Sequence, residues 1–275
     1  MGRSAFVAFR VEWLNFGIPG RQSGEERLGH MRAYKKIRHP SALTGAQLDA
    51  FLALGWYRMN QTIFTLTHSF IDDLGDFRPV WWLRYPLQDL PVRDAHRRMR
   101  RRNASFRVEL ISNYRPHPTH ELLYNRYLES VPFDGYSSIH DALYYDDDES
   151  IYDTHALQIW DGGRLVAMGI FDTGDKSGSS ILHFYDPEYA RFSLGKYLIL
   201  LTIDELCARG CEWYYPGYVV TDVRRFDYKL FLGRDVAEYF DPGSQSWKPW
   251  HDEVLRPVSY TEEEWAAYFS DFFMG

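Results

Sequence analysis

The chain has 275 residues, of which 45% are hydrophobic, so it is long enough to bury one large core or two modest ones. Its 31 basic and 38 acidic side chains give a formal net charge of −7, which excludes nucleic-acid binding through bulk positive charge. No apolar run is long enough for a membrane-spanning helix.

The N-terminal part of the sequence has a weak pattern that strengthens after residue 40. Residues 1–40 are rich in glycine and arginine and are expected to be irregular. Thr44, with a glutamine three positions later, is a capping-box pattern that begins a short helix, and Gly55 ends it. Residues 56–67 and 78–87 are rich in β-branched and aromatic side chains and predict strands.

An arginine-rich segment comes next. Residues 93–103 predict a helix, and eight arginines but only two acids occur between Arg84 and Arg107. The arginines that share one face of this helix are Arg93, Arg97, Arg100 and Arg101. Such a face is either a solvated basic surface or a surface that neutralises nucleic-acid phosphates, and the residues alone leave both interpretations open.

The C-terminal part has the most regular pattern. A strand and a helix are predicted first, at residues 106–112 and 120–130, followed by a loop at 132–150. The further predictions are strands at 154–160 and 164–171 joined by an Asp-Gly-Gly hairpin, a strand at 179–185, a helix from 193 to 207 that Ser193 caps and Gly210 ends, strands at 212–215 and 236–240, and a helix at 261–272.

The order strand, hairpin, strand, helix, strand is typical of an acetyltransferase-type α/β domain. We therefore predict an α/β fold of two acetyltransferase-like lobes, residues 1–109 and 110–275, of which the C-terminal lobe is the more regular. In that fold the helix after the central strand presents unpaired backbone N–H groups to a phosphate. The residues of the corresponding turn are Arg191, Ser193, Gly195 and Lys196. Its single glycine makes it a loose version of a coenzyme A turn.

Several short stretches of the C-terminal half occur in a distinctive order and spacing. They are residues 165–172 (LVAMGIFD), 184–189 (FYDPEY), 193–197 (SLGKY), 213–218 (WYYPGY) and 228–229 (YK). Together they resemble the aminoacyl-tRNA–protein transferases, the family of the arginyltransferases and the related leucyltransferases. Residues 55–58 (GWYR) resemble an early turn of the same family.

The resemblance implies transfer of Arg or Leu from an aminoacyl-tRNA to the N-terminal amine of a protein, usually one that begins with Asp or Glu and is thereby tagged for degradation. The partners would be the charged tRNA and such proteins, with no membrane. The family's cysteine cluster, associated with a metal or iron–sulfur centre, has no counterpart here, because residues 59–82 contain no cysteine. We expect neither a metal nor another cofactor.

The cysteine count and the N-terminus predict a cytoplasmic protein. Residues 1–11 lack the continuous apolar segment of a signal peptide. Cys207 and Cys211 are too few for a disulfide framework or a four-ligand zinc site, and small buried residues near a helix end are the commoner explanation for them.

The chemistry implied by the resemblance requires an amine held against an ester, one proton removed and an oxyanion stabilised. For the proton we choose Asp186, which ends the central strand, although on the sequence alone a simple turn at Asp186 and Pro187 is the better-supported explanation. Gln158 bonds the substrate or occupies a strand face, and Tyr218 is the third catalytic candidate. His183 lies in a predicted strand and is interpreted as a core histidine.

Recognition of an acidic N-terminal side chain requires a fixed cation. Arg225 and Lys229, four residues apart, are the candidates, with Tyr228 beside them and Arg58 in reserve. Salt bridges to neighbouring aspartates are the alternative explanation of these charges.

Two other functions stay open at this level. One is an acyl-coenzyme A-dependent N-acyltransferase of the same fold, which would need a more complete pyrophosphate turn than residues 191–196 offer. The other is a non-catalytic adaptor that binds acidic N-termini or tRNA.

Overall fold

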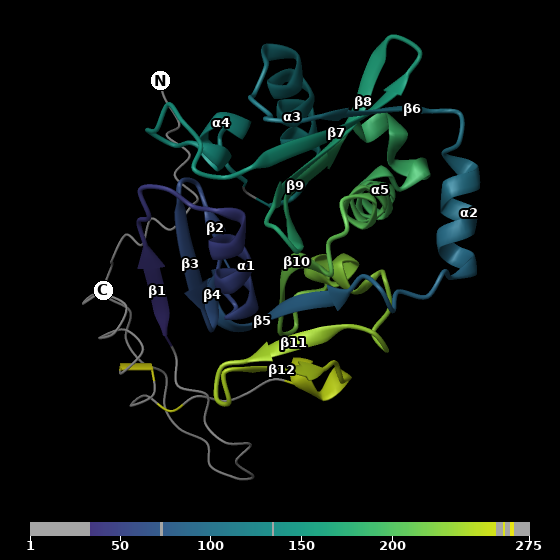
Figure 1. The fold of residues 1–275 in the computed structure, drawn as a ribbon. Coiled ribbons are helices and arrows are strands. Elements are labelled where there is room, and N and C mark those ends of the chain that lie inside the picture. The colour runs from purple at the N-terminus through teal and green to yellow at the C-terminus, as the bar shows by residue number, and fades with distance from the viewer. Residues whose placement is uncertain (1–33, 72–73, 134, 257–260, 262–264, 267–275) are drawn as a thin grey trace.

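The structure is a computed structural model that describes residues 34–71, 74–133, 135–256, 261 and 265–266 (Figure 1). Of the helix predicted at 261–272, most residues lie outside that range. Among the residues described, no helix is long and apolar enough to cross a membrane.

Helices and strands both occur throughout the described chain. The α-helices are α1 (Gly45–Ala53), α2 (Asp94–Arg102), α3 (Pro118–Ser130), α4 (Ile139–Leu143) and α5 (Leu194–Ala208), and the 3₁₀ helices are η1 (Pro187–Phe192), η2 (Arg224–Leu230) and η3 (Asp252–Leu255). The strands are β1 (Lys35–Arg38), β2 (Tyr57–Met59), β3 (Thr62–Leu66), β4 (His68–Ile71), β5 (Asp76–Pro86), β6 (Arg107–Ile111), β7 (Thr154–Asp161), β8 (Arg164–Thr173), β9 (Ser177–Tyr185), β10 (Trp213–Val220), β11 (Glu238–Asp241) and β12 (Ser246–Pro249).

Two sheets organise the described residues. A nine-stranded sheet has the order β12-β11-β5-β10-β9-β8-β7-β6, with β4 paired to one end of β5, and a three-stranded sheet has the order β1-β3-β2. All pairs in the large sheet are antiparallel except β9 with β10. The predicted α/β class and the order β7-β8-β9-α5-β10 are confirmed.

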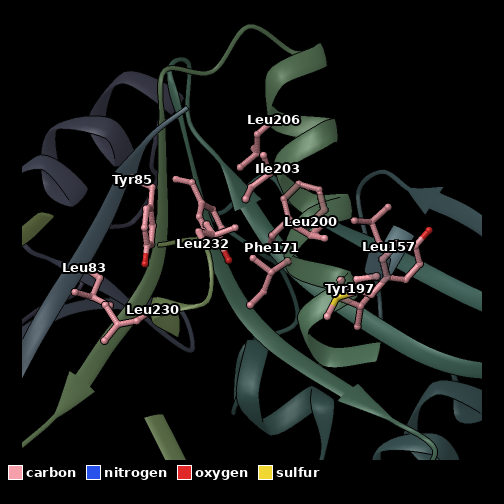
Figure 2. Packing of buried hydrophobic residues seen from close by; sticks show 14 of the residues in the cluster. Leu83, Tyr85, Leu157, Phe171, Tyr197, Leu200, Ile203, Leu206, Leu230 and Leu232 are labelled. Atoms are coloured by element: carbon pink, nitrogen blue, oxygen red, sulfur yellow. The ribbon is translucent and has the colours of Figure 1, made fainter. Parts of the chain in front are cut away.

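The main core lies between the large sheet and α5. Figure 2 shows Leu200, Ile203 and Leu206 of α5 packed with Leu157 and Phe171 from the sheet. Each such fully buried side chain contributes about 1.5–3 kcal/mol by leaving water. The buried positions of α5 surround most of its circumference, because the helix lies between the sheet and α2 rather than on a free surface.

Strand β5 joins the early part of the chain to the late part. It pairs antiparallel with β10 along one edge, from Trp213 opposite Pro86 to Val220 opposite Val80. On the other edge it pairs with β4 and β11. The large sheet therefore contains strands from both predicted lobes, and the division after residue 109 stays a prediction.

Local sequence signals explain most of the element boundaries. Thr44 forms the predicted capping box with Gln47, and Gly55 follows the helix with a φ of 73°. The hairpin between β7 and β8 turns at Gly162, where φ is 56°. The helix predicted at 93–103 is confirmed as α2.

Three expectations are wrong in detail. Residues 35–38 form β1 instead of irregular chain, and α4 lies in the expected loop at 132–150, with the Ser138 side chain accepting from the N–H of Asp141. The strand expected at 56–67 is a hairpin of β2 and β3, turned by Asn60 with a φ of 54°. Asparagine tolerates this left-handed conformation, so the hairpin forms without the glycine that usually marks such a turn.

Candidate functional site

The parallel strands β9 and β10 pair at one end only and then separate. Their register runs from Ser177 opposite Trp213 to Ser179 opposite Tyr215, although β9 continues to Tyr185. The cause lies in β10, whose register against β5 shifts between Tyr214 and Gly217. Pro216 has no N–H for a ladder, and Gly217 has a φ of 97°. Polar residues past this point of β9, β10 and the nearby η2 form the candidate site.

Lys229 of η2 is the most unusual group there. Its Nζ lies 4.7 Å from the ring centre of Phe226, 5.2 Å from that of Tyr228 and 5.4 Å from that of Tyr218. Burial lowers the pKa of its ε-amine to about 7. A glycine at position 217 leaves room for this side chain, because a Cβ there would lie 3.3 Å from Cε of Lys229.

Strand β9 contributes neutral polar groups to the site. The Ser180 hydroxyl lies 2.7 Å from the Tyr214 hydroxyl and 3.4 Å from Nε2 of His183. Burial, with a smaller contribution from the charge of Lys229, lowers the pKa of His183 to about 4, so its imidazole is neutral at physiological pH. A buried, neutral imidazole with a hydroxyl neighbour agrees with the interpretation of His183 as a core histidine. Tyr214 belongs to the WYYPGY stretch quoted above, whereas Ser180 lies outside those stretches, and the contact between the two hydroxyls follows from the pairing of β9 with β10.

The acceptor-binding candidates of the C-terminal half lie together on η2. The Arg225 guanidinium lies 5.8 Å from the ring centre of Phe133 and 5.3 Å from that of Phe226, the ring on which Tyr218 stacks. Tyr228 is 41% exposed, so η2 presents part of this cluster at the surface. The structure therefore places Tyr218 with the η2 candidates, as one aromatic cluster around Lys229.

Asp186 does not have the surroundings of a free base. It caps η1, and its carboxylate lies 2.6 Å from the Arg164 guanidinium and 3.1 Å from that of Arg126. Its Oδ1 accepts from the N–H of Glu188. Two cations and a backbone donor hold the carboxylate, so its contacts agree with the turn interpretation, and we do not retain it as the proton acceptor.

Gln158 and Arg58 also have internal partners. The Gln158 amide nitrogen lies 2.8 Å from Nε2 of His120, and its oxygen accepts from the indole of Trp160. The Arg58 side chain is 1% exposed and lies 2.8 Å from the Asp172 carboxylate. It also donates to the Leu143 carbonyl and the Thr154 hydroxyl. Arg58 is therefore part of the core, which contradicts its reserve role as a cation for an acceptor.

The arginines of α2 divide into paired and unpaired groups. Arg93 pairs with Asp235, Arg97 with Asp94 and Arg100 with Asp204. Arg98 and Arg101 are exposed, and within the described ranges neither forms an ion pair. Of the four arginines predicted to share one basic face, only Arg101 is thus without an ion pair among the described residues, because Asp94 of the helix itself and the distant Asp204 and Asp235 pair with the others.

The C-terminal end of α2 adjoins the turn at residues 191–196. Arg102 and Asn103 both donate to the carbonyl of Phe192, at 3.2 Å. Arg191 and Lys196 are exposed beside that contact, next to Gly195. Ser193 has the expected N-cap position, but its φ is 55° and its side chain makes no cap hydrogen bond, which corrects the predicted capping. The structure thus brings the two predicted phosphate-binding groups together (Figure 1).

Known proteins match the part of the chain that contains this candidate site. The family profile described as "Arginine-tRNA-protein transferase, C terminus" matches residues 119–233. The aspartate/glutamate leucyltransferase of Acinetobacter baumannii is 28% identical over 148 residues, 53% of this chain and 55% of that protein. The enzyme of the same name from Methylorubrum populi is 29% identical and covers 71% of this chain and 82% of its own. Arginyl-tRNA–protein transferase 2 of Arabidopsis thaliana is 30% identical over 54% of this chain and 25% of its own.

Residues 119–233 are thus similar to the C-terminal part of the arginine-tRNA–protein transferases, and the leucyltransferases match over the same region. The chain spans about half the length of the first relative, 55%. The family segment contains α5, both separating strands and η2 with Lys229, whereas α2 lies outside it. Among solved structures, a GCN5-related glucosamine N-acetyltransferase region of a fungal protein has a TM-score of 0.36 and 17% identity, covering 70% of this chain and 22% of its own. That likeness is too low to carry an argument.

Proposed function

We propose that this chain transfers an amino acid from an aminoacyl-tRNA to the N-terminal amine of a protein. One observation carries the proposal. The residues that match the family profile, 119–233, include both the place where β9 separates from β10 and the Lys229 cluster. Similarity to this family supports the reaction class. The names of the relatives include leucyl and arginyl transfer, and we propose one of these two as the donated residue.

The exposed basic groups support a contact with the tRNA end. Arg98 and Arg101 of α2, with Arg191 and Lys196 of the adjoining turn, are exposed side chains that lie on neighbouring elements. Cations and helix N-termini are the groups that hold nucleic-acid phosphates. This local surface suits an acceptor stem even though the whole chain carries a net charge of −7.

For the acceptor, we propose a protein that begins with Asp or Glu, as the names of the leucyltransferase relatives suggest. Arg225 is the cation assigned to that side chain, because it is one helical turn from Lys229 and beside the Tyr218–Phe226 stack. A guanidinium binds a carboxylate through paired hydrogen bonds, so replacing it should reduce the preference for acidic acceptors more than the reaction itself.

The test is transfer of radiolabelled amino acids from a total pool of charged tRNA to peptides that begin with Asp, Glu or Ala. Label on the Asp and Glu peptides is the expected result, and the labelled amino acid identifies the donor. Arg225→Gln should reduce the ratio of Asp to Ala acceptors, while Lys176→Met, an exposed lysine paired with Glu212, should leave transfer unchanged.

Two outcomes would reject the proposal. If acetyl-coenzyme A is consumed with an amine while no amino acid is transferred, the chain is an N-acyltransferase of related fold. If neither substrate reacts but the chain retains tRNA or acidic peptides, it is a binding protein.

A further inference from the structure

Lys229 lies in surroundings that favour a neutral amine. Three aromatic rings have their centres within 5.4 Å of its Nζ, and none of the ion pairs found among the described residues involves it. Its backbone is held in place, because the Tyr85 hydroxyl donates to the Lys229 carbonyl at 2.9 Å. The aromatic rings attract an ammonium only weakly compared with lost hydration, so burial lowers its pKa to about 7.

The other titratable groups around Lys229 do not restore a charged partner. From β9, His183 is neutral, since its pKa is lowered to about 4. Burial raises the pKa of Tyr214 and of Tyr218, so both stay uncharged too. The groups facing this region are His183 of β9, Tyr214 and Tyr218 of β10, Arg225 and Tyr228 of η2, and Tyr85 of β5.

We propose that the ε-amine of Lys229 is the general base of the transfer reaction, an inference that rests on the proposed function. The acceptor α-amine attacks the ester carbonyl of the aminoacyl-tRNA, and a C–N bond forms. Lys229 takes the proton that the attacking nitrogen then carries. When the bond between the carbonyl carbon and the ribose oxygen breaks, the Lys229 ammonium returns that proton to the leaving oxygen. The amide and the free tRNA are formed, and the lysine is neutral again.

A base and a binding cation at this position behave oppositely with pH. A base is active when deprotonated, so the rate rises as pH increases through about 7 and then levels. If Lys229 instead bound an acidic acceptor as an ammonium, it would lose that charge over the same pH range, and the rate would fall. The acceptor α-amine, with a pKa of roughly 7.7–8.0, titrates in every variant, so the ratio of parent to variant rates isolates Lys229.

The experiment measures single-turnover transfer to Asp and Ala peptides between about pH 5.5 and pH 9. Lys229→Arg keeps the charge but cannot accept a proton, and Lys229→Met removes both. We expect each to slow transfer by about 10²–10⁴-fold on both peptides, with tRNA binding unchanged. Lys176→Met is the matched control and should match the parent.

Chemical rescue guards against a merely structural effect. Lys229→Cys, made in a background with Cys207 and Cys211 replaced by alanine, is treated with bromoethylamine to rebuild an amine that carries a sulfur in its chain. The sulfur withdraws electrons and lowers the pKa of that amine. Transfer should return, with the rise of its rate displaced to lower pH.

The inference and the proposed function can fail separately. A parent chain that transfers no amino acid rejects both. If the parent chain transfers an amino acid and Lys229→Arg keeps the parent's rate on the Asp peptide, Lys229 is not the general base and acts as a binding cation instead. Rescue with an unshifted pH profile also rejects the base, since the rate would then not depend on this amine's protonation.

Discussion

Replacing Arg58 by methionine should lower the free energy of unfolding by about 3–5 kcal/mol, because it leaves a buried carboxylate without its cation. The Arg58 guanidinium and the Asp172 carboxylate are 1% and 0% exposed and lie 2.8 Å apart. Among the described residues Asp172 would retain only the hydroxyl of Thr154, at 2.7 Å, and its second oxygen already has no hydrogen-bond partner there. Methionine roughly matches the volume of the arginine stem, so the loss reflects charge more than cavity.

The loss in the free energy of unfolding that Arg58→Met causes should be smaller at low pH. Burial raises the pKa of Asp172, whereas Arg58 lowers it, so the pKa rises further in the variant. A carboxyl whose pKa is higher in the folded than in the unfolded chain binds its proton more readily when folded. Protonation therefore stabilises the folded variant at low pH, and this stabilisation is lost as pH rises from the unfolded value of roughly 3.9 through the folded one.

Urea unfolding followed by circular dichroism at about pH 5.5 and pH 8 measures both effects. At slopes of about 1–3 kcal/mol per molar urea, the midpoint should fall by about 1–5 M at pH 8 and by less at pH 5.5. Arg78→Met is the control, since its pair with Asp76 is half exposed and should contribute below about 1 kcal/mol. Equal midpoints for the two variants would refute the reasoning. Lost transfer at unchanged stability would instead restore Arg58 as an acceptor-binding residue.

Three further substitutions test separate parts of the structure. Ser193→Gly should raise stability by about 1 kcal/mol in a thermal melt, because Ser193 has a φ of 55° and no cap hydrogen bond to lose; a lower melting temperature would contradict this. Arg101→Gln should weaken tRNA binding in a filter-binding assay and lower the salt dependence of binding by the equivalent of about one phosphate contact. Arg100→Gln should have less effect, because its side chain pairs with Asp204, and equal effects would count against an α2 contact. Gly178→Ala should cost about 1–3 kcal/mol in urea, because its Cβ would lie 2.3 Å from a leucine of α5, and an unchanged midpoint would show that the helix can shift.

Elements with local signals could be predicted from the sequence. The capping box of Thr44 and the Gly162 hairpin each depend on a few neighbouring residues, and both are present in the structure. The α4 helix also had such a signal, a serine followed three residues later by Asp141, but its five residues are too short for a clear apolar period. At Ser193 such a local signal is misleading, because its left-handed backbone follows from how η1 meets α5.

The candidate site could be predicted less well than the fold. Lys229 and Tyr218 were found through family motifs, yet the low pKa of Lys229 depends on rings that only folding brings around it. Asp186 ends a strand as expected, but its cations come from α3 and β8, and no spacing rule links them. The same holds for Arg58, whose carboxylate partner lies 114 positions along the chain.

The position of β5 between β10 and β11 affects how the protein can be made. β5 is synthesised early but must wait for β10, which follows all of β6 to β9, before that edge is paired. Pairing across such a separation is slow, and an open strand edge favours aggregation in the meantime. A fragment limited to residues 119–233 would keep β10 but lose β5, and so would expose that edge permanently. Expression of the family segment alone is therefore expected to yield insoluble material, and the reaction has to be studied on a chain that includes β5.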